Sequence, residues 1–422
     1  MSDQSLAAQI EELGRRARAA ARVLALCPRA AKDAALQAMA DALEADEAAL
    51  LAANAQDLEA APGFGLNSAA IDRLRLTPDR IRAMARGVRE VADLADPVGG
   101  IIREWTRPNG LQITKIRVPI GVVGIIYESR PNVTADAAVL CLKSGNACIL
   151  RGGKESLHSN LAIARALSAG AVAAGLPADV IQLVPFTDRD GVRLLAQMDR
   201  HLDVIVPRGG HALIKAVVEH ARMPVIKHYH GVCHVFVDKA ADLAMASRIV
   251  MNAKCQRPGV CNALETLLVH RDVAEAFLPA AAAELRAAGV ELRGDVRTRE
   301  VLGADTKAAT EADWTEEYLD LILSIRVVDS LDDAVDHIEQ YGSHHTDTIV
   351  TADEESARRF LAAVDSATVL WNASTRFSDG GEFGFGAEIG ISTDKLHARG
   401  PMGLEELTTY KYLARGDGQV RG

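Results

Sequence analysis

Apolar residues recur at helical spacing through the first part of the chain. Residues 3–60 and 69–95 show this spacing, with Ala, Leu, Glu and Arg dominating, and APGFGLNS (61–68) interrupts it. Apolar positions three and four residues apart predict amphipathic helices, and a Pro/Gly cluster predicts a break between them. We therefore expect the chain to begin with helices in two segments.

The pattern changes to β-type residues in IIREWTRPNGLQITKIRVP (101–119). These residues flank Pro108-Asn109-Gly110 on both sides, and Asn-Gly suits the positive φ angles of a tight turn. The segment therefore predicts a β-hairpin. An exposed hairpin is only marginally stable by itself, which fits pairing with another subunit.

Strand-like and helix-like segments alternate along the rest of the chain. In a first series, residues 120–127, 146–152, 180–185 and 202–210 are strand-like, and residues 134–145, 159–175, 191–198 and 211–221 are helix-like. In a second series, residues 234–238, 263–269, 323–328 and 346–351 are strand-like, and residues 243–254 and 273–289 are helix-like. Such alternation predicts parallel sheets with crossover helices. The fold class that we expect is α/β, with two doubly wound domains.

Charge and cysteine content narrow the class of protein. The 422 residues include 47 basic and 57 acidic side chains, a net charge of −10 that argues against a nucleic-acid-binding protein. No apolar run is long enough to span a membrane, and residues 1–20 suit an amphipathic helix better than a signal peptide. We therefore expect a cytoplasmic protein whose six cysteines stay reduced and form no disulfide framework.

NAKCQRPGVC (252–261) places two cysteines around an Arg-Pro-Gly turn. Cys261 is expected between a helix and a strand, where a rigid corner holds a side chain in a fixed place. Lys254 and Arg257 would favour its thiolate, which is the nucleophilic form. A buried packing cysteine is the alternative interpretation of Cys261. Cys255, near the end of the predicted helix, suits packing better.

Two glycine-containing turns suggest phosphate binding. Gly209 and Gly210 directly precede a predicted helix, whose N-terminal NH groups and dipole attract anions. LRGGKES (150–156) follows a predicted strand and combines two glycines with Arg151 and Lys154. An ordinary strand–helix loop is the alternative for both turns.

Two histidine-rich segments raise a metal hypothesis. KHYHGVCH (227–234) gathers three histidines and a cysteine, and YGSHHTDT (341–348) contains two histidines and an aspartate. No second Cys/His pair with matching spacing completes a tetrahedral zinc site. We therefore expect the histidines of 227–234 to line a cleft or to pack between strands, and we predict no metal centre. For residues 341–348, a helix cap, a polar substrate pocket and a catalytic role remain open.

Four segments in the expected order resemble one known family. Residues 119–156, 256–270, 327–350 and 382–412 resemble the aldehyde dehydrogenase superfamily and, within it, the γ-glutamyl phosphate reductases of proline biosynthesis. The resemblance covers nearly the whole chain. It implies an NADP-binding domain (1–100 and 119–233), a catalytic domain (234–370) and a small β oligomerisation arm (101–118 with 400–422).

The resemblance also implies an activity. The enzyme would reduce L-glutamyl 5-phosphate to L-glutamate 5-semialdehyde, with Cys261 attacking the acyl phosphate to form a thioester. Asn132, together with the backbone NH of Cys261, would hold the oxyanion. Arg130 and Arg257 are the expected partners of the substrate phosphate and carboxylate, which suit guanidinium groups.

The resemblance favours NADP(H) as the cofactor. Where many NAD-using members of the superfamily carry a glutamate that holds the ribose hydroxyls, this chain has Lys154. Lys154 with Arg151 would attract a 2′-phosphate, whereas a carboxylate would repel it. Gly209 and Gly210 would contribute to the cofactor site, and Glu317 would hold the nicotinamide ribose.

Other functions remain open at this point. The resemblance implies a homodimer or homotetramer and admits a glutamate kinase as the source of the acyl phosphate. A hydrolytic NAD(P)-dependent aldehyde dehydrogenase is one alternative, but it needs a glutamate as general base, and no carboxylate occurs between Glu219 and Asp238. A non-catalytic dinucleotide-binding scaffold is another, and its Cys261 would react no faster than free cysteine.

Overall fold

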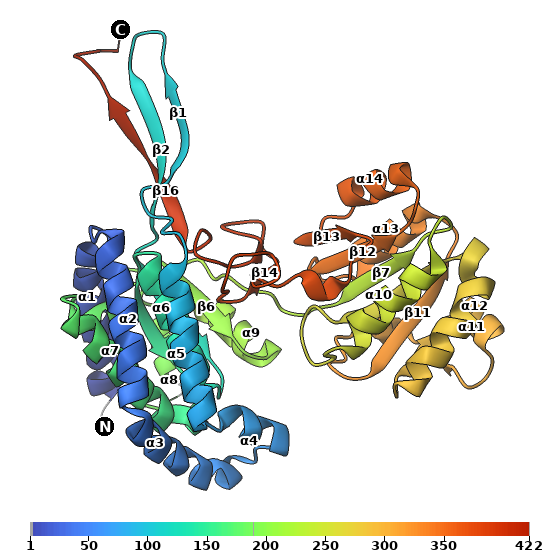
Figure 1. Cartoon of the computed structure of the whole chain (residues 1–422), viewed down its shortest axis with the longest axis horizontal. Coiled ribbons are helices and arrows are strands. Elements are labelled where there is room, and N and C mark those ends of the chain that lie inside the picture. Colours follow the sequence, from blue (N-terminus) through green and yellow to red (C-terminus); the bar gives the residue numbers. More distant parts are fainter. Residues whose placement is uncertain (1–2, 189, 422) are drawn as a thin grey trace. The chain divides into compact units, whose positions relative to one another are not determined.

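The structure is a computed structural model that describes residues 3–188 and 190–421 (Figure 1). The chain forms two compact units. Unit 1 comprises Met1–Lys227, Phe385–Gly390 and Met402–Gly422, and unit 2 comprises His228–Gly384 and Ile391–Pro401. The C-terminal part of the chain therefore contributes to both units.

Unit 1 is built on a four-stranded parallel sheet with the order β5-β4-β3-β6. Its strands are β3 (Val122–Tyr127), β4 (Ala147–Arg151), β5 (Ile181–Leu183) and β6 (Val204–Arg208). The chain leaves β3 for β4 on one side and later returns to β6 on the other. The carboxyl ends of β3 and β6 therefore form the topological switch point, where open α/β sheets bind ligands.

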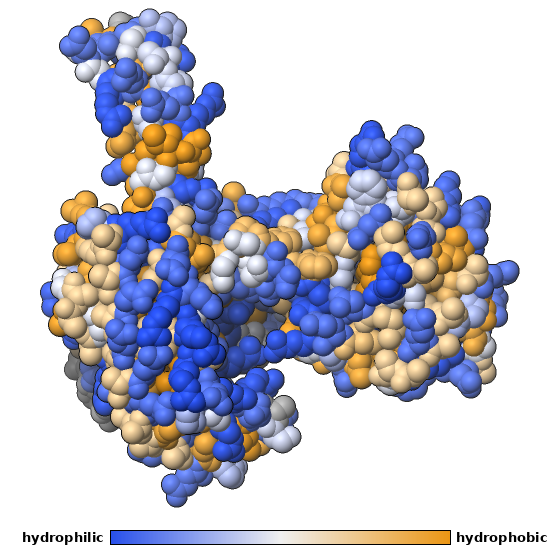
Figure 2. All heavy atoms as spheres, in the orientation of Figure 1, coloured by the Kyte–Doolittle hydropathy of each residue, from blue (hydrophilic) through white to orange (hydrophobic). Residues whose placement is uncertain are grey.

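Helices cover both faces of this sheet. They are α1 (Asp3–Leu24), α2 (Arg29–Ala45), α3 (Glu47–Ala60), α4 (Ser68–Leu74), α5 (Pro78–Asp93), α6 (Pro131–Lys143), α7 (Leu157–Ala173), α8 (Asp190–Ala196) and α9 (His211–His220), with 3₁₀ turns η1 (Ala61–Phe64), η2 (Lys154–Ser156) and η3 (Ala178–Val180). Residues of α1, α8 and α9 share one core with Val122 and Ile205 of the sheet. Helices α2, α5, α6 and α7 pack together, with the charged residues of α5 and α2 facing solvent (Figure 2).

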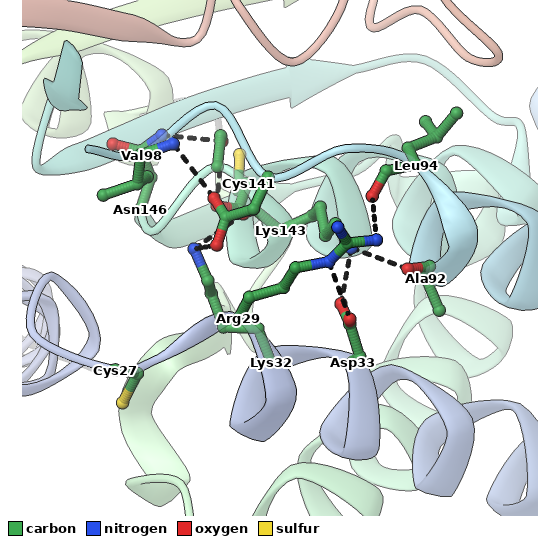
Figure 3. Close-up of polar contacts among 12 residues, drawn as sticks. Cys27, Arg29, Lys32, Asp33, Ala92, Leu94, Val98, Cys141, Lys143 and Asn146 are labelled. Carbon is green, nitrogen blue, oxygen red and sulfur yellow. Dashed lines mark hydrogen bonds and ion pairs between the residues drawn. The ribbon is translucent and has the colours of Figure 1, made fainter. Parts of the chain in front are cut away.

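Two buried lysines join α2, α5 and α6 (Figure 3). Lys32 Nζ lies 2.6 Å from a carboxylate oxygen of Asp96 and 3.1 Å from the carbonyl oxygen of Lys143. Lys143 Nζ lies 2.5 Å from Asp33 Oδ1 and 2.6 Å from the carbonyl oxygen of Ala92. Each buried ammonium group thus has an anionic partner, which offsets the cost of removing it from water. The network fixes the C-terminal end of α6, the helix that follows β3.

The predicted hairpin is present as β1 (Ile101–Thr106) and β2 (Gln112–Pro119), which pair antiparallel. Gly110 in its turn has a φ of 83°, as the Asn-Gly signal predicts. Strand β16 (Thr408–Arg415) adds to β2, so the three strands form an antiparallel sheet with the order β1-β2-β16, which we call the arm. Figure 2 shows hydrophobic residues gathered on the arm near the rest of unit 1.

Unit 2 contains a seven-stranded parallel sheet with the order β10-β9-β11-β8-β7-β12-β13. Its strands are β7 (Cys233–Val237), β8 (Leu264–His270), β9 (Glu291–Gly294), β10 (Lys307–Ala308), β11 (Ile322–Val328), β12 (Thr346–Val350) and β13 (Thr368–Trp371). The central strands β7, β8 and β12 are buried along their whole length. Such strands need helices on both faces.

The helices of unit 2 meet that need. They are α10 (Leu243–Cys255), α11 (Arg271–Ala287), α12 (Val296–Leu302), α13 (Leu331–Tyr341) and α14 (Glu354–Ala363). Unit 2 also contains the 3₁₀ turns η4 (Glu311–Trp314) and η5 (Thr375–Phe377), and a short ladder of β14 (Ile391–Ser392) and β15 (Gly400–Pro401). Val235 and Leu267 point to a core with α10 and α11. Their neighbours Phe236 and Leu268 point to a core with α13 and α14 on the other face.

The predicted α/β fold class, with two doubly wound parts, is confirmed. The sequence pattern did not predict β9, β10 and β13, which have only two to four residues and therefore show little periodicity. All six cysteines are free thiols. Among the described residues, no helix is both long and apolar enough to cross a membrane.

Candidate active site

Cys261 lies on the loop between α10 and β8 in unit 2, as the sequence predicts, and it is half-buried. Cys255 is the last residue of α10 and packs against the core beneath β8, in agreement with its predicted role. Gly231 approaches the backbone of Cys261 so closely that a Cβ there would overlap the Cys261 carbonyl group. The position of Cys261 therefore depends on a glycine from another segment.

Cys233 also positions the backbone of Cys261, through a hydrogen bond. Its Sγ donates a hydrogen bond to the carbonyl oxygen of Cys261 at 3.2 Å and lies 3.7 Å from His345 Nδ1. Burial raises the pKa of the Cys233 thiol well above its ordinary value, so it stays protonated at neutral pH. Cys233 is therefore a hydrogen-bond donor that positions the corner.

Two histidines lie beside Cys261. Ligand atoms of His228, Cys261 and His345 all lie within 4.8 Å of one another. Complete burial lowers the pKa of His345 to about 3, so its imidazole is neutral at neutral pH. His228 Nδ1 donates to the carbonyl oxygen of Ile391 at 2.9 Å, which makes Nδ1 the protonated nitrogen of that ring in its neutral form.

The other two histidines of KHYHGVCH, His230 and His234, have different partners. His234 Nδ1 lies 2.8 Å from Asp347 Oδ1, and both side chains are buried. His230 lies 3.6 Å from Glu317 Oε2. The cluster in the sequence is thus divided among three separate contacts.

Lys254 does not act on Cys261 in the way that the sequence suggests. Its Nζ lies 2.7 Å from Glu265 Oε2, and both side chains are completely buried. Burial raises the pKa of Glu265 to about 7 and lowers that of Lys254, each opposed by the attraction between them. The charge of Lys254 is therefore matched by its own partner, so a thiolate at Cys261 would need another cation beside it.

Arg376, which the sequence did not single out, supplies one such cation. It donates to Asn262 Oδ1 and, through Nε, to Gln256 Oε1 at 2.7 Å. Burial lowers its pKa, yet an arginine stays charged at neutral pH, and Arg257 and Cys261 are near enough to interact with it electrostatically. A single arginine on an irregular segment offered no pattern by which to find it.

Glu317, predicted to hold the nicotinamide ribose, is largely buried in unit 2. Burial raises its pKa, whereas a hydrogen bond from the backbone NH of Gly231 and the interaction with the His230 side chain oppose that rise. Glu317 thus contacts the glycine that packs against Cys261. Its role toward a cofactor stays a prediction.

The two predicted cofactor cations come together in unit 1. Arg151 and Lys154 line one cavity of about 740 Å³, whose wall also includes Tyr127 at the end of β3 and Leu213 of α9. Arg130, which was predicted to bind the substrate, lines the same cavity. Arg151 donates to the carbonyl oxygens of Thr187 and Asp188 at 3.4 Å each. Its buried Nε has no hydrogen-bond partner within the parts of the chain that the structure describes.

Gly209 and Gly210 lie between β6 and α9, at the switch point of this sheet. The backbone NH of Gly210 donates to Glu128 Oε1 at 2.7 Å. A Cβ at Gly209 would lie 2.6 Å from Glu128 Cδ, so a larger residue there would displace the Glu128 side chain. The N-terminus of α9 therefore already holds an anionic oxygen, supplied by the chain itself.

Asn132 lies in the first turn of α6 in unit 1, and its side chain is exposed. Its Nδ2 donates to Asp136 Oδ2 at 2.9 Å. Asn132 and Cys261 belong to different units. The predicted oxyanion role of Asn132 stays a prediction.

Comparison with known proteins decides the family. The sequence model of the aldehyde dehydrogenase family matches residues 2–304. A gamma-glutamyl phosphate reductase from Moorella thermoacetica is 59% identical over 417 residues, 99% of this chain and 100% of the relative. Another, from Geobacter metallireducens, is 58% identical over 417 residues, with the same coverage of 99% and 100%. The chain belongs to the aldehyde dehydrogenase family and, within it, to the gamma-glutamyl phosphate reductases.

A solved structure of this family agrees with that assignment. Gamma-glutamyl phosphate reductase from Thermotoga maritima superposes with a TM-score of 0.96 at 45% identity, over 98% of this chain and 100% of that one. The resemblance inferred from four segments is therefore confirmed, and so is the aldehyde-dehydrogenase-like fold. The roles of the predicted site residues in catalysis and in binding remain predictions.

Proposed function

We propose that this chain reduces L-glutamyl 5-phosphate to L-glutamate 5-semialdehyde and phosphate, with NADPH as the reductant, as a step of proline biosynthesis. The observation that carries the proposal is full-length similarity to relatives named for this reductase activity. A cysteine held on a rigid corner, with a cation beside it, is the chemical group that such a reaction needs.

Cys261 is the proposed nucleophile. Its thiolate attacks the acyl carbon, a C–S bond forms, and the C–O bond to phosphate breaks, so phosphate leaves with the electron pair. NADPH, when bound, would supply the hydride for reduction of this thioester. The thiohemiacetal oxyanion on Cys261 then re-forms its C=O bond as the C–S bond breaks, which releases the aldehyde and restores the thiolate.

The cavity of unit 1 fits a nicotinamide dinucleotide. Its volume of about 740 Å³ lies within the range of small-ligand pockets. Arg151 keeps a buried Nε without a described partner, and Lys154 is exposed on the wall. These two cations suit the 2′-phosphate of NADP(H). Gly209 and Gly210, at the head of α9, are proposed to approach the pyrophosphate, for which Glu128 has to move aside or share the NH groups.

Substrate anions are proposed to bind to arginines in unit 2. Arg257 is exposed and Arg376 is half-buried beside it, close to Cys261. Two neighbouring guanidinium groups suit the phosphate and the carboxylate of the substrate. Arg130, which lines the cavity of unit 1, stays a proposed partner of the substrate anions. Asn132 remains the proposed oxyanion donor.

The absence of a general base separates this function from hydrolysis. No carboxylate occurs between Glu219 and Asp238, the stretch where hydrolytic relatives would carry it. Glu265 is bound to Lys254, and His345 is neutral but completely buried. Without that carboxylate, water attack on the thioester loses the roughly 10²–10⁴-fold help that it would give as a general base, whereas phosphate is already an anion.

The test is NADP⁺ reduction with glutamate semialdehyde at varied phosphate concentration. We expect a steady rate that rises with phosphate and is supported equally by arsenate. A rate that is independent of phosphate, with free glutamate as the product, would refute the proposal and favour the hydrolytic enzyme. No NADPH formation at any phosphate concentration, with a Cys261 no more reactive than free cysteine, would favour a scaffold.

We also propose that the arm pairs with another copy of this chain. Its outer strands β1 and β16 are both edges, and Ile101 and Tyr412 are 65% and 57% exposed. Exposed apolar edge strands favour pairing. Light scattering on the double variant Ile101→Lys/Tyr412→Lys should show smaller particles than the wild type, and an unchanged mass would refute this assembly.

A further inference from the structure

The sheet of unit 2 brings three soft ligands to one edge. His228 lies in the segment before β7, Cys261 lies before β8, and His345 directly precedes β12. β7 pairs in parallel with both β8 and β12, so the starts of the three strands are neighbours. The resulting ligand atoms lie within 4.8 Å of one another, although the residues are far apart in the sequence.

Both histidines are in a state that suits metal binding. His228 donates its Nδ1 proton to the carbonyl oxygen of Ile391, which orients the ring and leaves Nε2 as the nitrogen with a lone pair. His345 is fully buried, and its Nε2 has no hydrogen-bond partner among the residues that the structure describes.

We propose that His228, Cys261 and His345 form a binding site for Zn²⁺ that reversibly blocks Cys261. Two imidazoles and a thiolate are donors that bind zinc in preference to magnesium or calcium. Tetrahedral zinc ligands lie roughly 3.5 Å apart, given bonds of about 2.0–2.3 Å, so no two of the three atoms have to approach by more than about 1.3 Å. Water fills the fourth position.

Binding involves no electron transfer. The S–H bond of Cys261 breaks, its proton passes to solvent, and a Zn–S bond forms. The metal then occupies the lone pair that would attack the acyl phosphate, so the loaded protein is inactive. This last consequence rests on the proposed function, whereas metal binding itself does not. The site differs from the hypothesis based on residues 227–234, of which it uses only His228.

The experiment is a titration of the full-length, metal-free protein with Co²⁺ and then with Zn²⁺ against a chromophoric chelator. We expect one metal ion per chain, a thiolate-to-cobalt charge-transfer absorption, and tetrahedral ligand-field bands that Zn²⁺ abolishes. Cys261→Ser and His345→Ala should each weaken Zn²⁺ binding by roughly 100-fold or more, beyond the 10–100-fold effect of an outer-shell partner. Cys255→Ala, the matched cysteine control, should bind as the wild type does.

Folding of each variant is checked by circular dichroism. His228→Ala, at a half-buried position, gives the second histidine test if the His345 variant does not fold. Unchanged affinity in Cys261→Ser, a cobalt spectrum without thiolate absorption, or no stoichiometric binding would overturn the proposal. Because none of these readouts uses turnover, failure of the reductase assay leaves them interpretable. Zinc should also slow alkylation of Cys261 in the wild type but not in His228→Ala.

Discussion

The cavity of unit 1 takes its cations from the ends of regular elements: Arg151 closes β4, and Lys154 begins η2. The position of Cys261 in unit 2 depends instead on buried residues from separate segments. These contribute the hydrogen bond of Cys233, the close approach of Gly231, and the ion pair of Lys254 with Glu265. A binding site can be assembled from side chains that reach solvent. A nucleophile needs a position fixed by groups that cannot move.

This difference predicts that single changes in unit 2 have larger effects than those in unit 1. The largest expected effect is that of replacing the proposed nucleophile. Cys261→Ala should lower turnover by roughly 10⁴-fold or more, because nothing else can form the thioester. NADPH binding, measured by fluorescence titration, should be unchanged because its proposed site is in unit 1. Cys255→Ala should keep most of the activity, and a comparable loss in that control would show that the corner was wrongly assigned.

The second prediction concerns the buried ion pair under the corner. Lys254→Met removes the partner of Glu265 and should lower the free energy of unfolding of unit 2 by about 3–5 kcal/mol at alkaline pH. Arg358→Met, which breaks an exposed pair with Glu354, should change it by less than about 0.5 kcal/mol. Urea titrations of both variants give the comparison. Equal effects would mean that the buried pair does not support the corner.

The same pair gives a pH dependence. The native pKa of Glu265, about 7, is above its ordinary value of 4.5, so this carboxyl contributes stability that is complete below about pH 4.5 and is lost as the pH rises through 7. Without Lys254 the native pKa rises further. The destabilisation of Lys254→Met should therefore grow between about pH 6 and pH 8, by at most about 1.4 kcal/mol per pH unit. A destabilisation that shrinks over this range would contradict the assignment.

The smallest expected effect is in unit 1. Lys154→Glu should weaken NADPH binding more than NADH binding by about 1–3 kcal/mol, since solvent screens part of the Coulomb energy at an exposed site. Lys154→Gln, which removes the charge without reversing it, should give a smaller discrimination. Fluorescence titration with both cofactors measures the difference. If the two affinities fall equally, Lys154 does not contact the 2′-phosphate.

The features that the sequence could predict are local ones. The strands, the crossover helices and the arm hairpin follow from local periodicity and turn residues. The place of Arg151 and Lys154 in a turn after a strand was predictable from the two glycines and the strand before them, whereas their role toward a cofactor stays a prediction. Cys261 was predictable as a corner residue for the same local reason, from the turn at 257–259.

Contacts between distant segments were not predictable. Lys254 was expected to act on Cys261, but its pairing with Glu265 depends on how α10 packs on β8. His228 and His345 meet Cys261 only because β7 lies between β8 and β12. Arg376 joins them from η5 through Asn262. No spacing in the sequence encodes such an assembly, and the same holds for Glu128 at the head of α9.

The most direct test asks whether Cys261 carries the acyl group. Full-length protein is mixed with NADP⁺ and glutamate semialdehyde in phosphate-free buffer, quenched with acid, and examined by intact-mass and peptide-mass spectrometry. We expect one NADPH per chain and a single glutamyl group on the peptide that contains Cys261, removed when phosphate is added before the quench. Acylation of Cys255, or sustained NADPH formation without phosphate and without any acylated cysteine, would contradict the mechanism.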